Sequence, residues 1–392
     1  MDVVTSYLEL GLRLGRHVDG LVDAYYGPPE LAAAVEAEPL HDATALAADA
    51  ETLLDALPAS GLEEGRQGWL GDQLRGLRTY AGVLAGETVS YSDEVERCYG
   101  VRPQTTSEAV FEEMHAHLDE LLPAGGSLLE RYEAWRATTF VPRESVVPAL
   151  ERVVAVLRER TRALYGLPER ESLTLDSVEH EPWAAFNYYL GRQRSHVVIN
   201  VDHPVTAGDL IETAAHEGFP GHHTEHAWKE QRLIDERGWL EEAIQLVPTP
   251  QAIVSEGIAE VGSAIVLDEA TKAAVTAIVL EHGANYDPAF AGEIAKARRR
   301  IRGVGMNAAI AIHEQGLSPE EAEAYVARWA LVTPARARQN IDFITDPVWR
   351  AYVITYGEGR RLVEALVGTD EVAFGRLLTE QIRVGELIAA AD

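Results

Sequence analysis

The sequence predicts a mainly α-helical protein with one small β element. Apolar residues recur at three- and four-residue spacing along stretches rich in alanine, leucine and acidic residues, a pattern typical of amphipathic helices. Clusters of proline and glycine separate these stretches, and only one segment alternates as a strand does. With 392 residues, 46% of them apolar, the chain can bury a large core. We therefore expect one large multi-helix body.

The helices of the first half are the clearest. The periodic stretches are Asp42–Leu57, Ser107–Leu122 and Ser145–Tyr165. In the last of these, valine and leucine side chains form a single apolar stripe. Each stretch ends near a helix-breaking cluster such as Gly166-Leu167-Pro168, so we expect separate helices joined by short turns.

The strand candidate is Arg194–Val201 (RSHVVINV), which is β-branched and alternating. It precedes Thr206–His216, a predicted helix that Thr206 could cap. Later in the chain, Gln251–Val266 is predicted to be helical. Ser318-Pro319-Glu320-Glu321 has the cap, proline and acidic residue typical of a helix start.

Domain boundaries are hard to place, because the chain has no internal repeat and no low-complexity linker. We expect an N-terminal helical region over residues 1–190 and a catalytic region over residues 191–392, in one continuous body. The single cysteine, Cys98, fits a reducing compartment. The N-terminus lacks the pattern of a signal peptide, and no run of eighteen apolar residues occurs. We therefore expect a cytoplasmic protein.

The formal charge of −29 and the pI near 4.8 limit the partners of the protein. A negative field repels phosphate backbones and anionic membrane surfaces, so neither nucleic acid nor a membrane is an expected partner. No pattern in the sequence predicts an oligomeric state.

The segment Ala215–Trp228 (AHEGFPGHHTEHAW) carries the most chemical information. It holds four of the thirteen histidines, and Glu217 directly follows the first of them, His216. A lone histidine is usually a solvated side chain. A group favours a zinc site instead, because catalytic zinc takes about three protein ligands and keeps one position open. In H-E-x-x-H helices the second histidine follows four residues after the first, and here that position is Pro220.

The proline need not destroy the site. Pro220 interrupts regular helix geometry, and Gly221 tolerates whatever dihedral angles the detour requires. The detour can return His222 to His216, whereas a regular helix would place His223 about 10 Å along the axis. We therefore favour His222 over His223 as the second ligand. Glu217 keeps the position of the general base of such helices whatever happens at Pro220.

A third ligand is expected from the segment Val254–Ile265 (VSEGIAEVGSAI). Glu256 and Glu260 stand four residues apart on an otherwise small and apolar helix. Two carboxylates on an exposed face are one interpretation, but the apolar neighbours leave little room for one, and buried carboxylates need a cation. We expect Glu256 to be a metal ligand and Glu260 to accept a hydrogen bond from a histidine N–H.

These motifs resemble a known family. HEGFPGHH is similar to the H-E-x-x-P-G-H-H signature of the bacterial domain-of-unknown-function family 885, and further motifs follow in order. They are VVINVDHP, SEGIAE, AIHEQGLSPEEAEAYV and TYGEG, although Ile258 replaces the tryptophan usual in the family. The resemblance covers about half the chain, from Arg194 to Val363. It implies a zinc metallopeptidase with a gluzincin-like fold, distantly similar to the carboxypeptidase Taq family.

Three further residues are candidates for the chemistry. Tyr356 could stabilise an oxyanion, although a half-buried core tyrosine is an equal alternative. His313 ends an apolar helix, and the resemblance implies a place in the site. Within the basic run Lys296–Arg302, Arg302 could bind a substrate carboxylate.

The favoured function is zinc-dependent cleavage of short peptides, as by a carboxypeptidase, with Glu217 as general base. A zinc amidohydrolase acting on a non-peptide amide would use the same ligands. A non-catalytic protein whose metal site has decayed at Pro220 is the third hypothesis. Zinc content separates the third hypothesis from the first two, and a screen of peptides against acyl-amino acids separates the first from the second.

Overall fold

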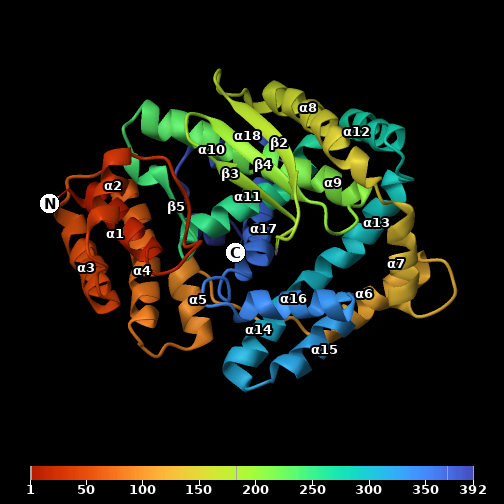
Figure 1. Ribbon diagram of the computed structural model, residues 1–392, viewed down its shortest axis with the longest axis horizontal. Coiled ribbons are helices and arrows are strands. Elements are labelled where there is room, and N and C mark those ends of the chain that lie inside the picture. Colours follow the sequence, from red (N-terminus) through yellow and green to blue (C-terminus); the bar gives the residue numbers. More distant parts are fainter. Residues whose placement is uncertain (1, 182, 369, 392) are drawn as a thin grey trace.

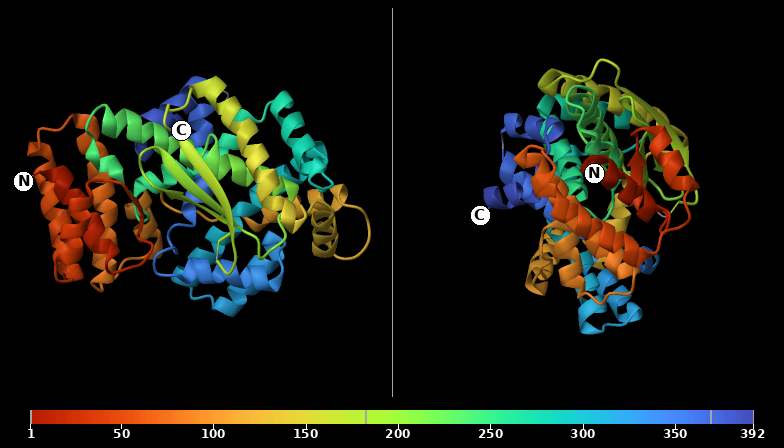
Figure 2. Two further views of the ribbon diagram at one scale, coloured as in Figure 1. Left: turned by 45° about the horizontal axis from the view of Figure 1, so that its top comes forward. Right: turned by 90° about the vertical axis from the view of Figure 1, so that its left-hand side faces the viewer.

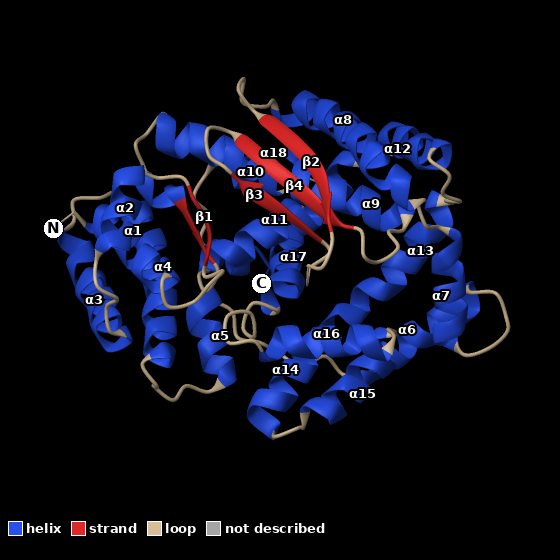
Figure 3. Ribbon diagram, viewed as in Figure 1, coloured by secondary structure: helices blue, strands red, loops and turns tan. Residues whose placement is uncertain are grey.

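The protein is mainly α-helical and has two small β-sheets (Figure 3). A computed structural model describes residues 2–181, 183–368 and 370–391. The helices of the first half are α1 (Val3–Gly15), α2 (Pro29–Ala37), α3 (Ala43–Ala56), α4 (Glu64–Leu84), α5 (Tyr91–Tyr99), α6 (Glu108–Leu121), α7 (Leu128–Thr138) and α8 (Val146–Tyr165). Those of the second half are α9 (Ala207–Thr213), α10 (His222–Lys229), α11 (Pro250–Val266), α12 (Glu269–Glu281), α13 (Pro288–Arg299), α14 (Gly303–Gln315), α15 (Pro319–Ala330), α16 (Pro334–Thr345), α17 (Ile354–Val367), α18 (Glu371–Thr379) and α19 (Val384–Ala391). The predicted fold class is confirmed.

Three of the predicted helices begin at capping side chains. Asp42 caps α3 and Ser107 caps α6, each by accepting a hydrogen bond from a backbone N–H of the first turn. Ser318 caps α15 in a complete capping box. Local side-chain chemistry therefore defines where these helices start.

The strands are more numerous than the sequence predicted. β4 (Arg194–Asn200) is the predicted strand, and it lies between β2 (Ser172–Val178), which is parallel to it, and β3 (Ala185–Tyr189), which is antiparallel. A second sheet pairs β1 (Val22–Tyr25) with β5 (Ile244–Leu246). The two strands beside β4 were not predicted, but hydrogen bonding requires them, because both edges of a buried strand need partners.

The N-terminal helices α1–α4 lie at one end of the molecule and α7 lies at the other, with the three-stranded sheet between them (Figures 1 and 2). Both sheets combine strands from the two sides of residue 190. Arg66 of α4 also binds Glu241 through two hydrogen bonds of 2.7 Å. The two predicted regions therefore share β-sheets and ion pairs.

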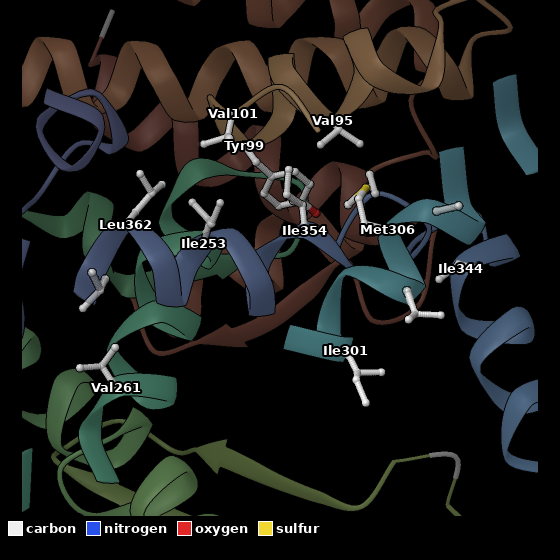
Figure 4. Close-up of a cluster of buried hydrophobic side chains, with 14 of the residues drawn as sticks. Val95, Tyr99, Val101, Ile253, Val261, Ile301, Met306, Ile344, Ile354 and Leu362 are labelled. Carbon is white, nitrogen blue, oxygen red and sulfur yellow. The ribbon is translucent and has the colours of Figure 1, made fainter. Parts of the chain in front are cut away.

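The central core lies around α11 and α17 (Figure 4). These helices meet at two glycines. A Cβ atom at Gly257 would lie 2.4 Å from the carbonyl oxygen of Gly359, and one at Gly359 would lie 2.5 Å from that of Ile253. Only glycine permits so close an approach. The glycines of SEGIAE and TYGEG therefore bring Glu256 and Tyr356 onto neighbouring helices.

Among the described helices, none is both long and apolar enough to cross a membrane. The cytoplasmic location stays a prediction.

Candidate metal centre

The histidine segment, His216–Lys229, begins where α9 widens. Thr206 caps α9 by accepting a 3.0 Å hydrogen bond from the backbone N–H of Asp209, as the sequence predicted. After α9 the chain forms a π-helical turn, η3 (Ala214–Gly218), which carries His216 and Glu217. Such turns are frequent at functional sites. The widening moves His216 off the regular α-helical register.

Pro220 and Gly221 then break the helix between η3 and α10. The Phe219–Pro220 peptide bond is cis, and α10 starts directly after Gly221. A Cβ atom at Gly221 would lie only 1.9 Å from the carbonyl oxygen of His216, so no other residue fits there without movement. Across this break, the ring centroids of His216 and His222 lie 4.8 Å apart. The detour expected from the sequence therefore occurs.

Three side chains converge on one point. The candidate ligand atoms of His216, His222 and Glu256 all lie within 4.8 Å of one another. Nε2 of His216 lies 3.5 Å from Oε2 of Glu256, and Nε2 of His222 lies 3.7 Å from Oε1. Their side chains are 21%, 14% and 8% exposed, respectively. Two imidazoles and one carboxylate are a ligand set typical of catalytic zinc.

The buried carboxylate supports this assignment. Oε2 of Glu256 is buried and makes no hydrogen bond in the described part of the chain. Burial opposes its ionisation, but the positive charges of the neighbouring histidines outweigh that effect, and the pKa of Glu256 falls to about 2. Burial lowers the pKa of His216, whereas Glu256 and Glu217 raise it more strongly, to about 10. The site therefore concentrates negative charge where a divalent cation would bind.

A buried hydrogen-bonded chain orients His222. The Ser255 hydroxyl donates to Glu225 at 2.6 Å and lies 3.2 Å from Nδ1 of His222. Because that hydroxyl donates to the carboxylate, it can accept a hydrogen bond from Nδ1–H of His222, and Nε2 is the ring atom directed at Glu256. Lys229 in turn binds Glu225 at 2.7 Å. Carboxylates that orient a ligating imidazole are usual around metals, and here a serine stands between the two.

His223 lies on the other side of the segment, whereas the buried ring of His226 stacks behind that of His222, with centroids 5.9 Å apart. His223 is fully buried, 2.8 Å from the Ser195 hydroxyl and 3.2 Å from Glu171. Burial lowers the pKa of His223, and it lowers that of His226 to about 3. Both are therefore neutral core histidines at neutral pH. The choice of His222 over His223 agrees with this geometry.

Tyr352 contacts the carboxylate of Glu256 directly, and it was not among the predicted site residues. Its hydroxyl donates to Oε1 of Glu256 at 2.6 Å. The ring of Tyr356 packs edge-on against the ring of Tyr352, with centroids 5.7 Å apart. The available signal was the spacing, because Tyr352 precedes the candidate Tyr356 by one helical turn. Ser255, adjacent to Glu256, was a second missed signal.

Tyr356 and Glu217 lie close enough to the triad to interact electrostatically. Burial, followed by the charges of Glu256 and Glu217, raises the pKa of Tyr356 well above its usual value. The hydroxyl therefore keeps its proton and can donate a hydrogen bond. Glu217 is fixed through its backbone, since its carbonyl oxygen accepts a 2.6 Å hydrogen bond from the amide of Asn187 on β3.

Glu260 does not accept a hydrogen bond from a histidine, contrary to the expectation. Its carboxylate pairs with Arg302 and lies 3.5 Å from Arg360. Arg360 also donates to the backbone carbonyl of Glu260 at 2.8 Å. One helical turn separates Glu260 from Glu256, and that distance is enough to place it among arginines. Arg302, the candidate for binding a substrate carboxylate, therefore already has a carboxylate partner.

His313 lies in the last turn of α14. Its Nε2 is 2.7 Å from the carbonyl oxygen of Ile344, and its ring stacks on Tyr91 at 4.8 Å between centroids. These contacts join α14 to α16 and α5. None of them includes a member of the triad.

The arrangement defines a helical protein with a two-histidine, one-glutamate metal-ligand cluster on a distorted helix. No protein-family model and no curated protein matches the chain. Among solved structures, a "putative lipoprotein" from Colwellia psychrerythraea is similar, with a TM-score of 0.56 and 14% identity over 89% of this chain and 69% of that one. A "putative lipoprotein of unknown function" from Shewanella oneidensis has a TM-score of 0.47 and 13% identity, over 91% and 75% of the two chains. An M32 carboxypeptidase from Deinococcus radiodurans has a TM-score of 0.43 and 14% identity, over 99% and 92%.

Proposed function

We propose that this protein is a zinc-dependent hydrolase that cleaves peptide bonds in short peptides. The observation that carries the proposal is the convergence of His216, His222 and Glu256, with a buried oxygen of Glu256 lacking a hydrogen bond. The H-E pair and the resemblance to family 885 support the same function. A bound zinc ion would polarise the scissile carbonyl and acidify a water molecule.

The other roles belong to the protein's own side chains. Glu217, directly after His216, accepts a proton from the attacking water at its carboxylate and returns it to the leaving amine. Tyr356 keeps its hydroxyl proton and donates a hydrogen bond to the oxyanion that forms on the substrate. Tyr352 and Ser255 hold Glu256 and His222 in their orientations.

Short peptides are the proposed substrates because the ligands are recessed. The three side chains are between 8% and 21% exposed, so an extended chain can reach them and a folded surface cannot. A tripeptide should be cleaved much faster than intact casein. Equal rates would contradict the proposed substrate class.

The test is the variant Glu217→Gln, because glutamine keeps the shape of the side chain but cannot accept a proton. Zinc measured after dialysis should remain at one equivalent, and kcat on a tripeptide should fall by about 10²–10⁴-fold. Glu236→Gln, at an exposed glutamate that pairs with Arg232 shortly after the histidine segment, is the matched control and should change neither quantity. Full turnover in Glu217→Gln, or no zinc in the unaltered protein, would refute the proposal.

A further inference from the structure

An acidic side chain on the first strand lies near the candidate centre but is not part of it. In the β1–β5 pairing, Val22 lies opposite Leu246 and Ala24 opposite Gln245, so the register shifts at Asp23. Such a bulge turns the side chain of the extra residue away from the regular alternation, and bulges are common beside active sites. The Asp23 side chain is exposed, whereas Ala24 is buried.

The packing of the small sheet brings Asp23 toward the triad, because β5, the partner of β1, packs against α11, the helix that carries Glu256. The Asp23 carboxylate is also close enough to the triad for charge–charge interactions. It interacts electrostatically with His222, Glu256 and Glu217, and it in turn raises the pKa of Tyr352 and Tyr356. The surrounding protein raises the pKa of Asp23 to about 6, with His222 opposing the shift and Glu256 and Glu217 adding to it. The Asp23 side chain is exposed and the rings of His216 and His222 are partly exposed, so water reaches all three. Asp23 therefore faces the same space as His222 and Glu217.

The neighbouring cations are already paired. Arg302 and Arg360 contact Glu260, and Lys229 contacts Glu225. Asp23 has no hydrogen-bond or ion-pair partner among the residues that the structure describes. The space beside the triad therefore offers a substrate an unpaired carboxylate, and the arginine that could have held a substrate carboxylate is engaged elsewhere.

We propose that Asp23 binds the free α-ammonium group of the peptide substrate, so that the enzyme removes residues from the N-terminus. This inference rests on the proposed peptidase function. The α-ammonium group lies two bonds from the carbonyl carbon of the first residue, so a carboxylate beside the metal site can hold it while that carbonyl is attacked. Charge-assisted hydrogen bonds are the stronger kind and give this recognition its energy. A lysine or arginine side chain offers the same positive charge, and the experiment separates the two sources.

The experiment compares leucyl-alanine, acetyl-leucyl-alanine and acetyl-lysyl-alanine. Binding is measured by calorimetry on the zinc-loaded Glu217→Gln protein, with and without Asp23→Asn, and kcat/KM is measured with Glu217 intact. Asp23→Asn should weaken the binding of leucyl-alanine and lower its kcat/KM by about 10–100-fold, as expected for loss of a hydrogen bond to a charged group. Both acetylated peptides should bind poorly in every variant. Asp19→Asn, an exposed aspartate just before β1, is the matched control and should behave as the unaltered protein does.

The outcomes separate the inference from the function on which it rests. Equal cleavage of leucyl-alanine and its acetylated form, or an equal loss for both in Asp23→Asn, overturns the inference and leaves the peptidase function standing. A loss confined to acetyl-lysyl-alanine overturns it in favour of side-chain recognition. Absence of zinc and of any peptide binding overturns both.

Discussion

The two sides of the histidine segment have different environments although they share one short stretch of sequence. The open side carries His216 and His222, which solvent reaches and which point at Glu256. The core side carries His223, Glu225 and Lys229, which are buried and bound to one another or to the sheet. His222 and His223 are adjacent, so the residue type does not decide the role. The direction of the side chain decides the role, and the helix break at Pro220-Gly221 fixes that direction.

The largest expected difference between the two sides is in zinc binding. His222→Ala removes one of three ligands, so zinc affinity should fall by more than about 100-fold, beyond the range typical of changes around the ligands. His223→Ala should keep a full equivalent of zinc. It leaves the buried Ser195 hydroxyl without its partner, while Glu171 keeps Arg158, and it should lower the free energy of unfolding by about 1–3 kcal/mol.

Metal analysis after dialysis and thermal unfolding of both variants measure this difference. Loss of zinc in His223→Ala together with retention in His222→Ala would reverse the assignment of the second ligand.

The geometry of the helix break can be disturbed at Gly221. Gly221→Ala would press a Cβ atom against the carbonyl oxygen of His216, so the two histidines should separate. We expect loss of zinc and a drop in stability of about 1–3 kcal/mol or more, typical of overpacking. Gly218→Ala is a matched control on the same segment, because its nearest neighbour would be an ordinary 3.6 Å away. Similar zinc binding in both variants would show that the helix break at Pro220-Gly221 does not position His222.

A smaller effect is expected from the hydrogen-bonded chain between the two sides. Ser255→Ala removes the acceptor for Nδ1–H of His222, so zinc affinity should fall by about 10–100-fold. Glu260→Ala, on the next turn of α11, breaks only contacts to arginines and should leave zinc affinity unchanged. Competition with a chelator measures both affinities. An equal loss in the two variants would mean that Ser255 has no special role.

The sequence predicted what depends on local chemistry. Caps such as Thr206 and Ser318 act within one turn, and the triad could be inferred because histidines and a glutamate stood among apolar residues. The role of Glu260 was predicted wrongly, because its partner Arg302 is 42 residues away in the chain. Tyr352 and Asp23 were missed for the same reason. Their positions depend on how the turn before α17 packs on α11 and how β1 pairs with β5, which are contacts between distant segments. Only the spacing of Tyr352 from Tyr356 was a local signal.

The smallest expected effect concerns the core side alone and appears only as a dependence on pH. Glu242 is buried near Lys229, and burial raises its pKa to about 7, although Lys229 opposes the shift. In the unfolded chain a glutamate has a pKa of about 4.3, so between these values the folded state binds more protons than the unfolded state. The contribution of Glu242 to the free energy of unfolding should therefore fall as the pH rises from about 4 to 7.

Glu242→Gln removes this titration, so the variant should be more stable than the unaltered protein at pH 8, by about 1–3 kcal/mol, and the gain should shrink toward pH 5. The neighbouring Glu241→Gln is the opposite control. Its carboxylate holds Arg66 through two hydrogen bonds, so neutralising it should destabilise the protein at pH 8. Denaturant unfolding at both pH values measures the two effects, and zinc content should stay at one equivalent throughout. A loss of zinc in Glu242→Gln would show that the charges of the core side also govern the open side, and the separation of the two sides would then fail.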